Sequence, residues 1–417
     1  MRELVIVGGG AAGLMAALYA AREGAKVQLL ERNEKLGKKI YITGKGRCNL
    51  TNTAEPQQFM GNIPRNPRFL YSALNLLDNR GTMELFTRLG LLLKEERGGR
   101  VFPASDRASD VTRTLERACK GSGVEVHLNT RVERLLLEGG GVRGIVTGDG
   151  RELPADAVIV ATGGLSYPST GSTGDGYRLA EQAGLGVTPT RPSLVGIDTL
   201  ESWPGALSGL TLKNVRLTAA RGKKLLYNEQ GELLLTHYGI SGPLVLSLSA
   251  LLPDDCEGQA LQLDLKPALD EKTLDERLLR ELAALGRKQL ASAMDRLMPH
   301  SLGLALLELA GLSPTLPAHG VTRECRRELV RRIKGVTLTV RGLRGYEEAV
   351  VTRGGVDVRG INPSTMGSKA VAGLYFAGEV LDVDALTGGF NLQIAFSTGA
   401  LAGKSAVQYV TRDHGGG

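Results

Sequence analysis

The sequence predicts an α/β fold in which a parallel, nucleotide-binding sheet is interrupted by a long insertion. Three observations lead to this prediction: a strand–helix–strand pattern around closely spaced glycines at the start, two buried strand-like runs far downstream, and a β-rich and then helical stretch between those runs. At 417 residues the chain is too long for one ordinary core, so two or three domains are expected.

The opening segment is predicted to be a βαβ unit. An apolar run at 3–7 is followed by a small-residue-rich helical pattern at 11–23 and a second strand-like run at 26–31. Further along we expect helices over 68–98, 108–121 and 175–184, strands over 124–148 and 157–162, a β-rich segment over 188–266, helices over 270–334, strands at 336–341 and 374–378, and a last helix near 391–411.

This order predicts one nucleotide-binding domain that two inserted parts divide along the chain. The first insertion alternates short strand-like runs with turns, and the second carries apolar residues at helical spacing. The expected parts are 1–187 and 350–411 for the divided domain, 188–268 for the β-rich insertion, 269–349 for the mainly helical insertion and 412–417 for a disordered tail.

The glycines between the first strand and the first helix have the spacing GxGxxG, with Gly8, Gly10 and Gly13. Gly8 permits a tight turn, Gly10 lets the backbone approach a pyrophosphate, and Gly13 lets helix and strand pack closely. The helix N-terminus offers N–H groups and a partial positive charge to the phosphates. Glu31 ends the second strand, 18 residues after Gly13, where a carboxylate would accept hydrogen bonds from the ribose of an adenosine.

Later motifs distinguish FAD from NAD as the bound dinucleotide. A nicotinamide-dependent dehydrogenase has no need of AVIVATGG (157–164), TGDG (173–176) and GLYFAGE (373–379). In a two-dinucleotide-type, glutathione reductase-like flavoprotein, the first of these ends beside the cofactor and the last places an acid near the ribityl chain and the pyrophosphate. The FAD-binding residues predicted from these motifs are Ala161, Thr162, Gly163, Asp175, Gly378 and Glu379.

The last helix is predicted to begin in TGGFNLQIA (387–395). Its N-terminal amides, around Gly389, Asn391 and Leu392, would point at the pyrimidine edge of a flavin. A helix N-terminus at that edge stabilises the negative charge of the reduced ring by about 0.3–1 kcal/mol.

Several long motifs in order along the chain resemble one flavoprotein family. They are GKKIYITGKGRCNLTN (37–52), THYGISGP (236–243), VTRGGV (351–356) and SKAVAGLYFAGEVLDVDALTGGFNLQIAFSTGALAG (368–403). Together they resemble the YhiN/BaiN-like flavoproteins, described as aminoacetone-oxidase-like and related to the flavoproteins of fumarate reductase and succinate dehydrogenase. The resemblance implies an FAD-binding Rossmann domain interrupted by a β-barrel-like and a helical insertion. The sequence carries no recognisable motif for covalent attachment, so the FAD is expected to be non-covalent. It implies FAD contacts at Ala12, Glu31, Lys38, Lys39, Gly44, Val132, Glu379 and Leu392, with Val132 touching the adenine through its backbone.

Several absences narrow the chemistry. The four cysteines form no CxxC pair, which disfavours a disulfide framework, a structural zinc site and a dithiol redox pair. The one further GxGxxG spacing, at Gly139, Gly141 and Gly144, lies within the strands expected over 124–148 and opens no helix, so a second dinucleotide-binding unit is not expected and NAD(P)H is expected to visit the flavin transiently. A signal-peptide pattern and a run of about 18 apolar residues are both lacking, so we expect a cytoplasmic, bacterial protein without a membrane partner.

Reduction of a carbon–carbon double bond by a flavin needs hydride from N5 and a proton from a nearby acid. Cys48 follows Arg47, whose charge is expected to favour the thiolate. His237 is a second candidate, because imidazoles exchange protons near neutral pH, and Tyr41 is a third. The structural alternatives are that Cys48 is a small packing residue and that His237 braces its loop by hydrogen bonding.

The charge of the chain bears on its substrate. The formal net charge is +7, and the stretch 323–344 carries eight basic and two acidic residues, either as a solvated helix face or as a contact for a polyanion. The leading interpretation is an NAD(P)H-driven, FAD-dependent reductase of an electron-poor double bond in a small molecule. The alternatives are reduction of uracil to dihydrouridine in ribosomal RNA, oxidation of a small amino-ketone by O2, and a non-catalytic flavin-binding redox sensor.

Overall fold

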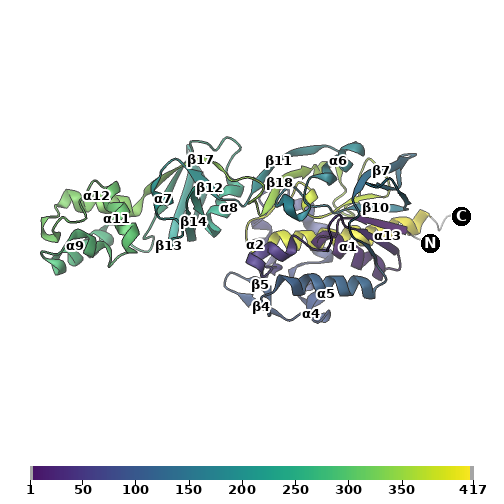
Figure 1. Ribbon diagram of the computed structural model, residues 1–417, viewed down its shortest axis with the longest axis horizontal. Helices are drawn as coiled ribbons and strands as arrows, with labels where there is room; N and C mark the ends of the chain where they lie inside the picture. Colours follow the sequence, from purple (N-terminus) through teal and green to yellow (C-terminus); the bar gives the residue numbers. More distant parts are fainter. Residues whose placement is uncertain (1–2, 414–417) are drawn as a thin grey trace. The chain divides into compact units, whose positions relative to one another are not determined.

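The structure, a computed structural model, describes residues 3–413 and divides into two compact units (Figure 1). Unit 1 contains the described residues up to Ser193 and from Gly345 onward, and unit 2 is Leu194–Arg344. Unit 2 begins and ends a few residues inside the predicted insertion, because β11 (Val187–Ser193) pairs with β18 (Val351–Val356) within unit 1. Of the predicted tail 412–417, residues 412 and 413 belong to the last helix, and 414–417 lie outside the described residues.

A five-stranded parallel sheet forms the centre of unit 1 and gathers strands from both ends of the chain. The strands near its centre are almost continuous apolar runs, as in the fully buried Leu4, Val5 and Ile6, because the inner part of a parallel sheet is buried on both faces. This sheet confirms the predicted α/β fold. In sheet order the strands are β19 (Leu374–Phe376), β10 (Ala157–Val160), β1 (Glu3–Val7), β2 (Lys26–Leu30) and β6 (Glu125–His127).

Two helices, α1 (Ala11–Arg22) and α13 (Phe390–Asp413), lie side by side in unit 1 (Figure 1). Their backbones approach so closely that a Cβ on Gly399 would lie 2.3 Å from the carbonyl oxygen of Ala12. The first helix follows β1 directly and the second follows β19, so this contact holds together the segments that carry the first and last glycine motifs.

The other elements of unit 1 surround this centre. The helix expected over 68–98 ends early, because Gly90 takes a φ of +86° after α4 and the chain continues as β4 (Leu93–Glu96). Within residues 3–413, no helix combines the length and the apolar character needed to cross a membrane. The remaining helices are α2 (Pro56–Gly61), α3 (Tyr71–Leu76), α4 (Asn79–Arg88), α5 (Ala108–Gly121) and α6 (Asp175–Gln182). One small sheet has the strand order β3 (Thr51–Asn52), β5 (Arg100–Pro103) and β4. The other has the order β7 (Val132–Glu138), β8 (Gly141–Thr147) and β9 (Glu152–Pro154).

Unit 2 combines a closed six-stranded barrel with a group of helices, as the fold prediction expected. The strand β17 (Val336–Leu343) closes the barrel by pairing with both β16 and β12, so the strand that follows the helices in the sequence belongs to the barrel. The barrel order is β12 (Ile197–Thr199), β15 (Gly239–Ser241), β14 (Lys224–Thr236), β13 (Thr211–Arg221), β16 (Ala260–Asp264) and β17, and the helices are α7 (Trp203–Ala206), α8 (Pro243–Leu251), α9 (Glu271–Leu285), α10 (Leu290–Met294), α11 (His300–Leu309) and α12 (Arg323–Lys334).

Candidate functional site

The glycine loop between β1 and α1 is the first part of the site. Gly8 has a φ of +106°, and a Cβ there would lie 2.5 Å from the carbonyl oxygen of Ala161, while a Cβ on Gly13 would lie 1.8 Å from that of Gly8. Packing alone therefore requires glycine at both positions. Gly10 differs, because a Cβ there would meet nothing within 4 Å, so this residue faces open space at the N-terminus of α1. Amides and partial positive charge at a helix N-terminus suit an anionic ligand such as a diphosphate.

Glu31, directly after β2, is held rigidly beside this loop. Its Oε2 accepts a hydrogen bond from Gly9 N at 2.8 Å, and its Oε1 accepts from N and Nδ2 of Asn33 at 2.8 and 2.7 Å. Its carbonyl oxygen accepts from Thr130 N at 2.9 Å, which brings the buried Val132 at the start of β7 close by. The arrangement suits a carboxylate that binds the ribose of a nucleotide whose adenine lies against β7.

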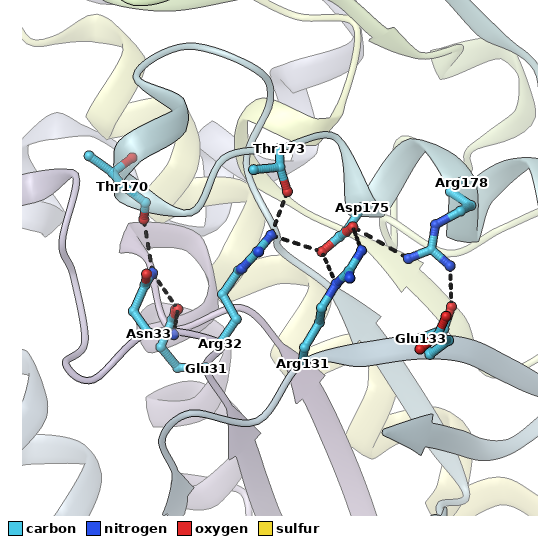
Figure 2. A network of polar contacts seen from close by, with 9 residues as sticks. All are labelled: Glu31, Arg32, Asn33, Arg131, Glu133, Thr170, Thr173, Asp175 and Arg178. Carbon is cyan, nitrogen blue, oxygen red and sulfur yellow. Dashed lines mark hydrogen bonds and ion pairs between the residues drawn. The ribbon is translucent and has the colours of Figure 1, made fainter. Parts of the chain in front are cut away.

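Three arginines converge on Asp175, the first residue of α6 (Figure 2). Arg131 donates from Nε to Oδ2 at 3.1 Å and from Nη2 to Oδ1 at 2.7 Å, and Arg32 and Arg178 donate at 3.1 and 3.3 Å. Burial alone would raise the pKa of Asp175, but the hydrogen bond and charge of Arg131, the charge of Arg32 and the hydrogen bond of Arg178 outweigh it and lower that pKa. Both carboxylate oxygens are thus used within the protein, and a contact of Asp175 with the cofactor stays a prediction.

Lys39 and Glu379, 340 residues apart in the sequence, form an ion pair at 2.6 Å. Lys39 Nζ also donates to Ser166 Oγ at 2.5 Å, Ser166 Oγ donates to Glu379, and Thr352 N donates to Glu379 Oε1 at 2.9 Å. Lys39 and Glu379 were each predicted from the sequence as separate FAD contacts, whereas Ser166 and Thr352 were not predicted. The signal for both was their place in motif segments, Ser166 just after ATGG and Thr352 in VTRGGV.

Among the buried polar atoms without a hydrogen-bond partner in the described residues, three lie in or next to the glycine-rich motifs of unit 1: Asn49 Oδ1, Thr162 Oγ1 and the Tyr177 hydroxyl. Thr162 Oγ1 lies against Gly176, where a Cβ would approach it to 2.2 Å. Buried polar atoms are normally hydrogen-bonded, so these atoms suit a polar ligand. Together with the open face of Gly10, they fit a bound dinucleotide such as FAD.

The start of α13 is braced by its own side chains. A Cβ on Gly389 would lie 2.9 Å from Asn49 Oδ1, which places this glycine next to one of the unpartnered oxygens. Asn391 folds back on its loop, because its Oδ1 accepts from Ala385 N at 2.9 Å and its Nδ2 donates to Ala385 O at 2.8 Å. The Asn391 side chain is therefore occupied within its own loop. The groups that Asn391 and the half-buried Leu392 can offer a flavin are their backbone N–H groups.

The remaining predicted contacts lie around the same motifs. Gly378 has a φ of +78°, and a Cβ there would lie 2.7 Å from Ala12 Cβ, so the Gly-Glu motif meets the first turn of α1. Gly163 and Gly44 also have positive φ values, +75° and +57°. Lys38 Nζ lies 3.3 Å from the carboxylate of the glutamate four residues before it. The cofactor contacts of these residues stay predictions.

Cys48 is completely buried, which raises the pKa of its thiol to about 12 even though a hydrogen bond with Thr43 acts in the opposite direction. Arg47 does not act on this thiol. Its Nε donates to Asp106 Oδ1 at 2.7 Å, and its guanidinium also pairs with Glu96. The prediction that Arg47 favours a Cys48 thiolate is therefore wrong, because the arginine charge is directed to two carboxylates and burial stabilises the neutral thiol.

The other two proton-donor candidates are more accessible. His237 is exposed after β14 in unit 2, and its ring meets the ring of Tyr238 edge-on at 5.0 Å. The contact that positions this imidazole is ring packing rather than a hydrogen bond within the described residues. Tyr41 is half-buried, with Lys35 Nζ 4.6 Å from its ring centroid.

The basic stretch at 323–344 is largely paired within unit 2. Four basic residues of α12 point to carboxylates, and the hydrogen bond from Arg331 is the largest cause that lowers the pKa of Glu328 to about 2. The stretch therefore offers a polyanion fewer free cations than its composition suggests. The pairs are Arg326–Asp275 at 2.6 Å, Arg331–Glu328 at 2.5 Å, Arg332–Glu328 at 2.8 Å and Lys334–Asp264 at 2.6 Å.

Comparison with known proteins places this geometry among flavoproteins. A family model described as HI0933-like protein Rossmann domain matches residues 2–405. The chain is 35% identical over 414 residues to the 3-dehydro-bile acid delta(4,6)-reductase of Clostridium scindens, covering 98% of this chain and 100% of the relative. It is 34% identical over 401 residues to the ribosomal RNA dihydrouridine synthase of Haemophilus influenzae, covering 95% and 96%. The solved 3-ketosteroid delta1-dehydrogenase from Sterolibacterium denitrificans shares the fold, with a TM-score of 0.51 at 15% identity over 98% of this chain and 100% of that one.

Proposed function

This chain belongs to the HI0933-like protein family, and we propose that it is an NAD(P)H-driven reductase that saturates an electron-poor carbon–carbon double bond in a small molecule. The family makes it an FAD-dependent oxidoreductase, whereas the electron donor and the substrate are the proposal. The observation that carries the proposal is the end-to-end similarity to an enzyme named as a reductase of a 3-dehydro-bile acid.

Unit 1 holds the residues proposed to bind FAD. The loop around Gly10 and the N-terminus of α1 bind the diphosphate, and the Glu31 carboxylate orients the adenosine ribose. The first-turn amides of α13 stabilise negative charge at the pyrimidine edge. Bound FAD supplies hydride exchange through its N5 atom.

His237 is the proposed proton donor. Saturation of a double bond needs a proton on the carbon that does not receive hydride. Histidine is the most common side chain in proton transfer by enzymes, and that of His237 is exposed, whereas Cys48 has no contact with solvent and its thiol pKa is raised to about 12. Cys48 therefore packs its loop rather than supplying the proton.

The pairing of the basic residues favours a small substrate. RNA affinity comes from basic side chains that meet phosphates and release counterions. Arg326, whose side chain is 13% exposed, and Lys334, whose side chain is 16% exposed, are turned to carboxylates and can add little to such contacts.

Reduction of uracil in ribosomal RNA is the second candidate, and the relative from Haemophilus influenzae supports it. One surface of unit 2 also favours it. The hairpin of β13 and β14 exposes Lys213, Arg216, Lys223 and Lys224, and none of the four forms an ion pair within residues 3–413.

The experiment that separates these candidates follows the flavin absorbance under anaerobic conditions. NADPH or NADH is added to the FAD-loaded protein, and the bleached flavin is then mixed with a 3-dehydro-4,6-diene bile acid, with deproteinised ribosomal RNA, with an amino-ketone, or with O2 alone. We expect rapid bleaching, rapid return of colour with the diene and slow return with the other three. Rapid return with RNA alone would establish the second candidate, and rapid return with O2 alone would indicate an oxidase.

Two variants test the proton donor. His237→Gln should slow the return of colour with the diene by at least about tenfold and leave bleaching unchanged. His319→Gln is the matched control, because His319 is another exposed histidine of unit 2, with Nδ1 3.2 Å from Gly286 O. Equal rates in the two variants would remove His237 from the mechanism.

A further inference from the structure

The arginine cluster around Asp175 adjoins the carboxylate proposed to bind the adenosine ribose (Figure 2). Arg32 follows Glu31 directly in the chain, and Arg131 follows Thr130, whose backbone N donates to Glu31 O at 2.9 Å. The side chains of Arg32 and Arg131 are 33% and 48% exposed, whereas that of Asp175 is 14% exposed. Solvent can therefore reach both guanidiniums while the carboxylate between them is mostly covered.

Arginine at this place has a known chemical use. In dinucleotide-binding folds, an acid at the end of the second strand binds the ribose 2′-hydroxyl, and an arginine nearby accommodates a 2′-phosphate instead. Here Glu31 and Arg32 are neighbours, so the residue types alone are compatible with either ribose. A guanidinium fork matches a phosphate and a carboxylate equally well in shape. The group that Arg32 and Arg131 bind, a protein carboxylate or a phosphate, therefore decides whether a ribose with a free 2′-hydroxyl or one with a 2′-phosphate fits.

We propose that Arg32 and Arg131 form an anion site for the 2′-phosphate of an adenine nucleotide, and that Asp175 occupies it so that the adenosine site beside Glu31 accepts FAD and excludes nucleotides with a 2′-phosphate from the place of FAD. Arg131 gives both of its hydrogen bonds, at 3.1 and 2.7 Å, to the Asp175 carboxylate, and Arg32 gives one at 3.1 Å. An entering phosphate would have to displace that carboxylate and would then lie beside its uncompensated negative charge.

Asp175 is itself well anchored in this position. It is the first residue of α6, where a negative charge is stabilised by the helix N-terminus. Arg32 Nη1 also donates to Thr173 Oγ1 at 2.5 Å, and Asn33 Nδ2 donates to Thr170 O at 2.9 Å, so the segment before α6 is fastened to the residues that follow β2. The inference rests on the FAD site and is independent of the proposed donor and substrate.

Competition for FAD rebinding in the full-length protein tests this proposal. FAD is stripped from the protein, and its return is followed by quenching of flavin fluorescence in the presence of 5′-AMP or of 2′,5′-ADP, which differ only in the 2′-phosphate. In the wild type we expect 2′,5′-ADP to compete no better than 5′-AMP. In Asp175→Asn it should compete at least about tenfold better, and this advantage should disappear when Arg131→Ala is added.

Asp149→Asn is the matched control, because Asp149 also pairs with an arginine, Arg151 at 2.9 Å, but in the turn between β8 and β9. A wild-type preference for 2′,5′-ADP, or an Asp175→Asn protein that rebinds FAD without gaining that preference, overturns the proposal.

If Asp175→Asn does not rebind FAD, the single variant Arg131→Ala decides. The proposal expects its ratio of affinities for 2′,5′-ADP and 5′-AMP to equal the wild-type ratio. If Arg131→Ala instead loses affinity for 2′,5′-ADP relative to 5′-AMP, then Arg131 was already available to a 2′-phosphate in the wild type and the proposal is wrong. Because the measurement uses neither donor nor substrate, its failure is distinct from a failure of the proposed reaction.

Discussion

The reactivity of Cys48 tests quantitatively how burial controls a thiol in this fold. Cys48 follows an arginine in the sequence, yet it is completely buried and the arginine charge is directed to Glu96 and Asp106. Burial raises the pKa of the thiol from 9.0 to about 12. The perturbation is alkylation of the folded, FAD-loaded protein with iodoacetamide between about pH 7 and pH 10.

The expected effect follows from the two pKa values. At pH 8 a thiol with a pKa of 9.0 is about one-tenth thiolate, and a thiol with a pKa of about 12 is about one ten-thousandth thiolate. Since the thiolate is the reacting species, ionisation alone should slow the alkylation of Cys48 about a thousandfold. The pKa is higher in the folded state, so the neutral thiol stabilises the fold fully below about pH 9, and this contribution of about 4 kcal/mol is lost as the pH rises through about 12.

Peptide mass spectrometry measures the labelling of Cys48 against that of Cys325, which is half-exposed and serves as the control in the same sample. Urea-unfolded protein gives the rate for the accessible thiol. Cys48→Ala should keep its FAD and its turnover and should lose less stability at alkaline pH than the wild type. Labelling of folded Cys48 as fast as Cys325 at pH 8, or loss of turnover in FAD-loaded Cys48→Ala, would refute the reasoning.

Three further substitutions test other parts of the structure. Gly13→Ala places a Cβ 1.8 Å from a backbone carbonyl oxygen, so we expect loss of FAD binding in a fluorescence titration, and retention of wild-type affinity would contradict the geometry. Arg65→Ala leaves the fully buried carboxylate of Asp384 without its 2.6 Å ion pair and should lower the free energy of unfolding in urea by about 3 kcal/mol, whereas a loss below about 1 kcal/mol would show that the pair contributes little. Arg326→Ala removes the pair with Asp275 and should cost about 1 kcal/mol of stability while leaving RNA affinity unchanged; weaker RNA binding with unchanged stability would restore the basic stretch as an RNA contact.

The nucleotide-binding core could be predicted from the sequence because its signals are local. The positions of Gly8 and Gly13 are dictated by backbone atoms of the same βαβ unit and the adjoining strand, and the strands are read as apolar runs because both faces of the sheet are buried. The same local reasoning failed over 93–98, where one glycine, Gly90, ends the helix and a strand follows. Periodicity alone did not reveal that break.

The sequence by itself determined that this chain binds a dinucleotide and that Glu31 follows the second strand of the binding unit, because those features lie within one short segment. Only the tertiary structure decided which charges meet. Glu379 pairs with a lysine 340 residues away, Asp175 pairs with Arg32 and Arg131 from two other segments, and Arg326 pairs with an aspartate 51 residues away. Composition gives the number of charges, but long-range packing decides whether a charge faces a partner or water. The cofactor could therefore be predicted from local motifs, whereas the pairing of the basic residues, which bears on the substrate, could not.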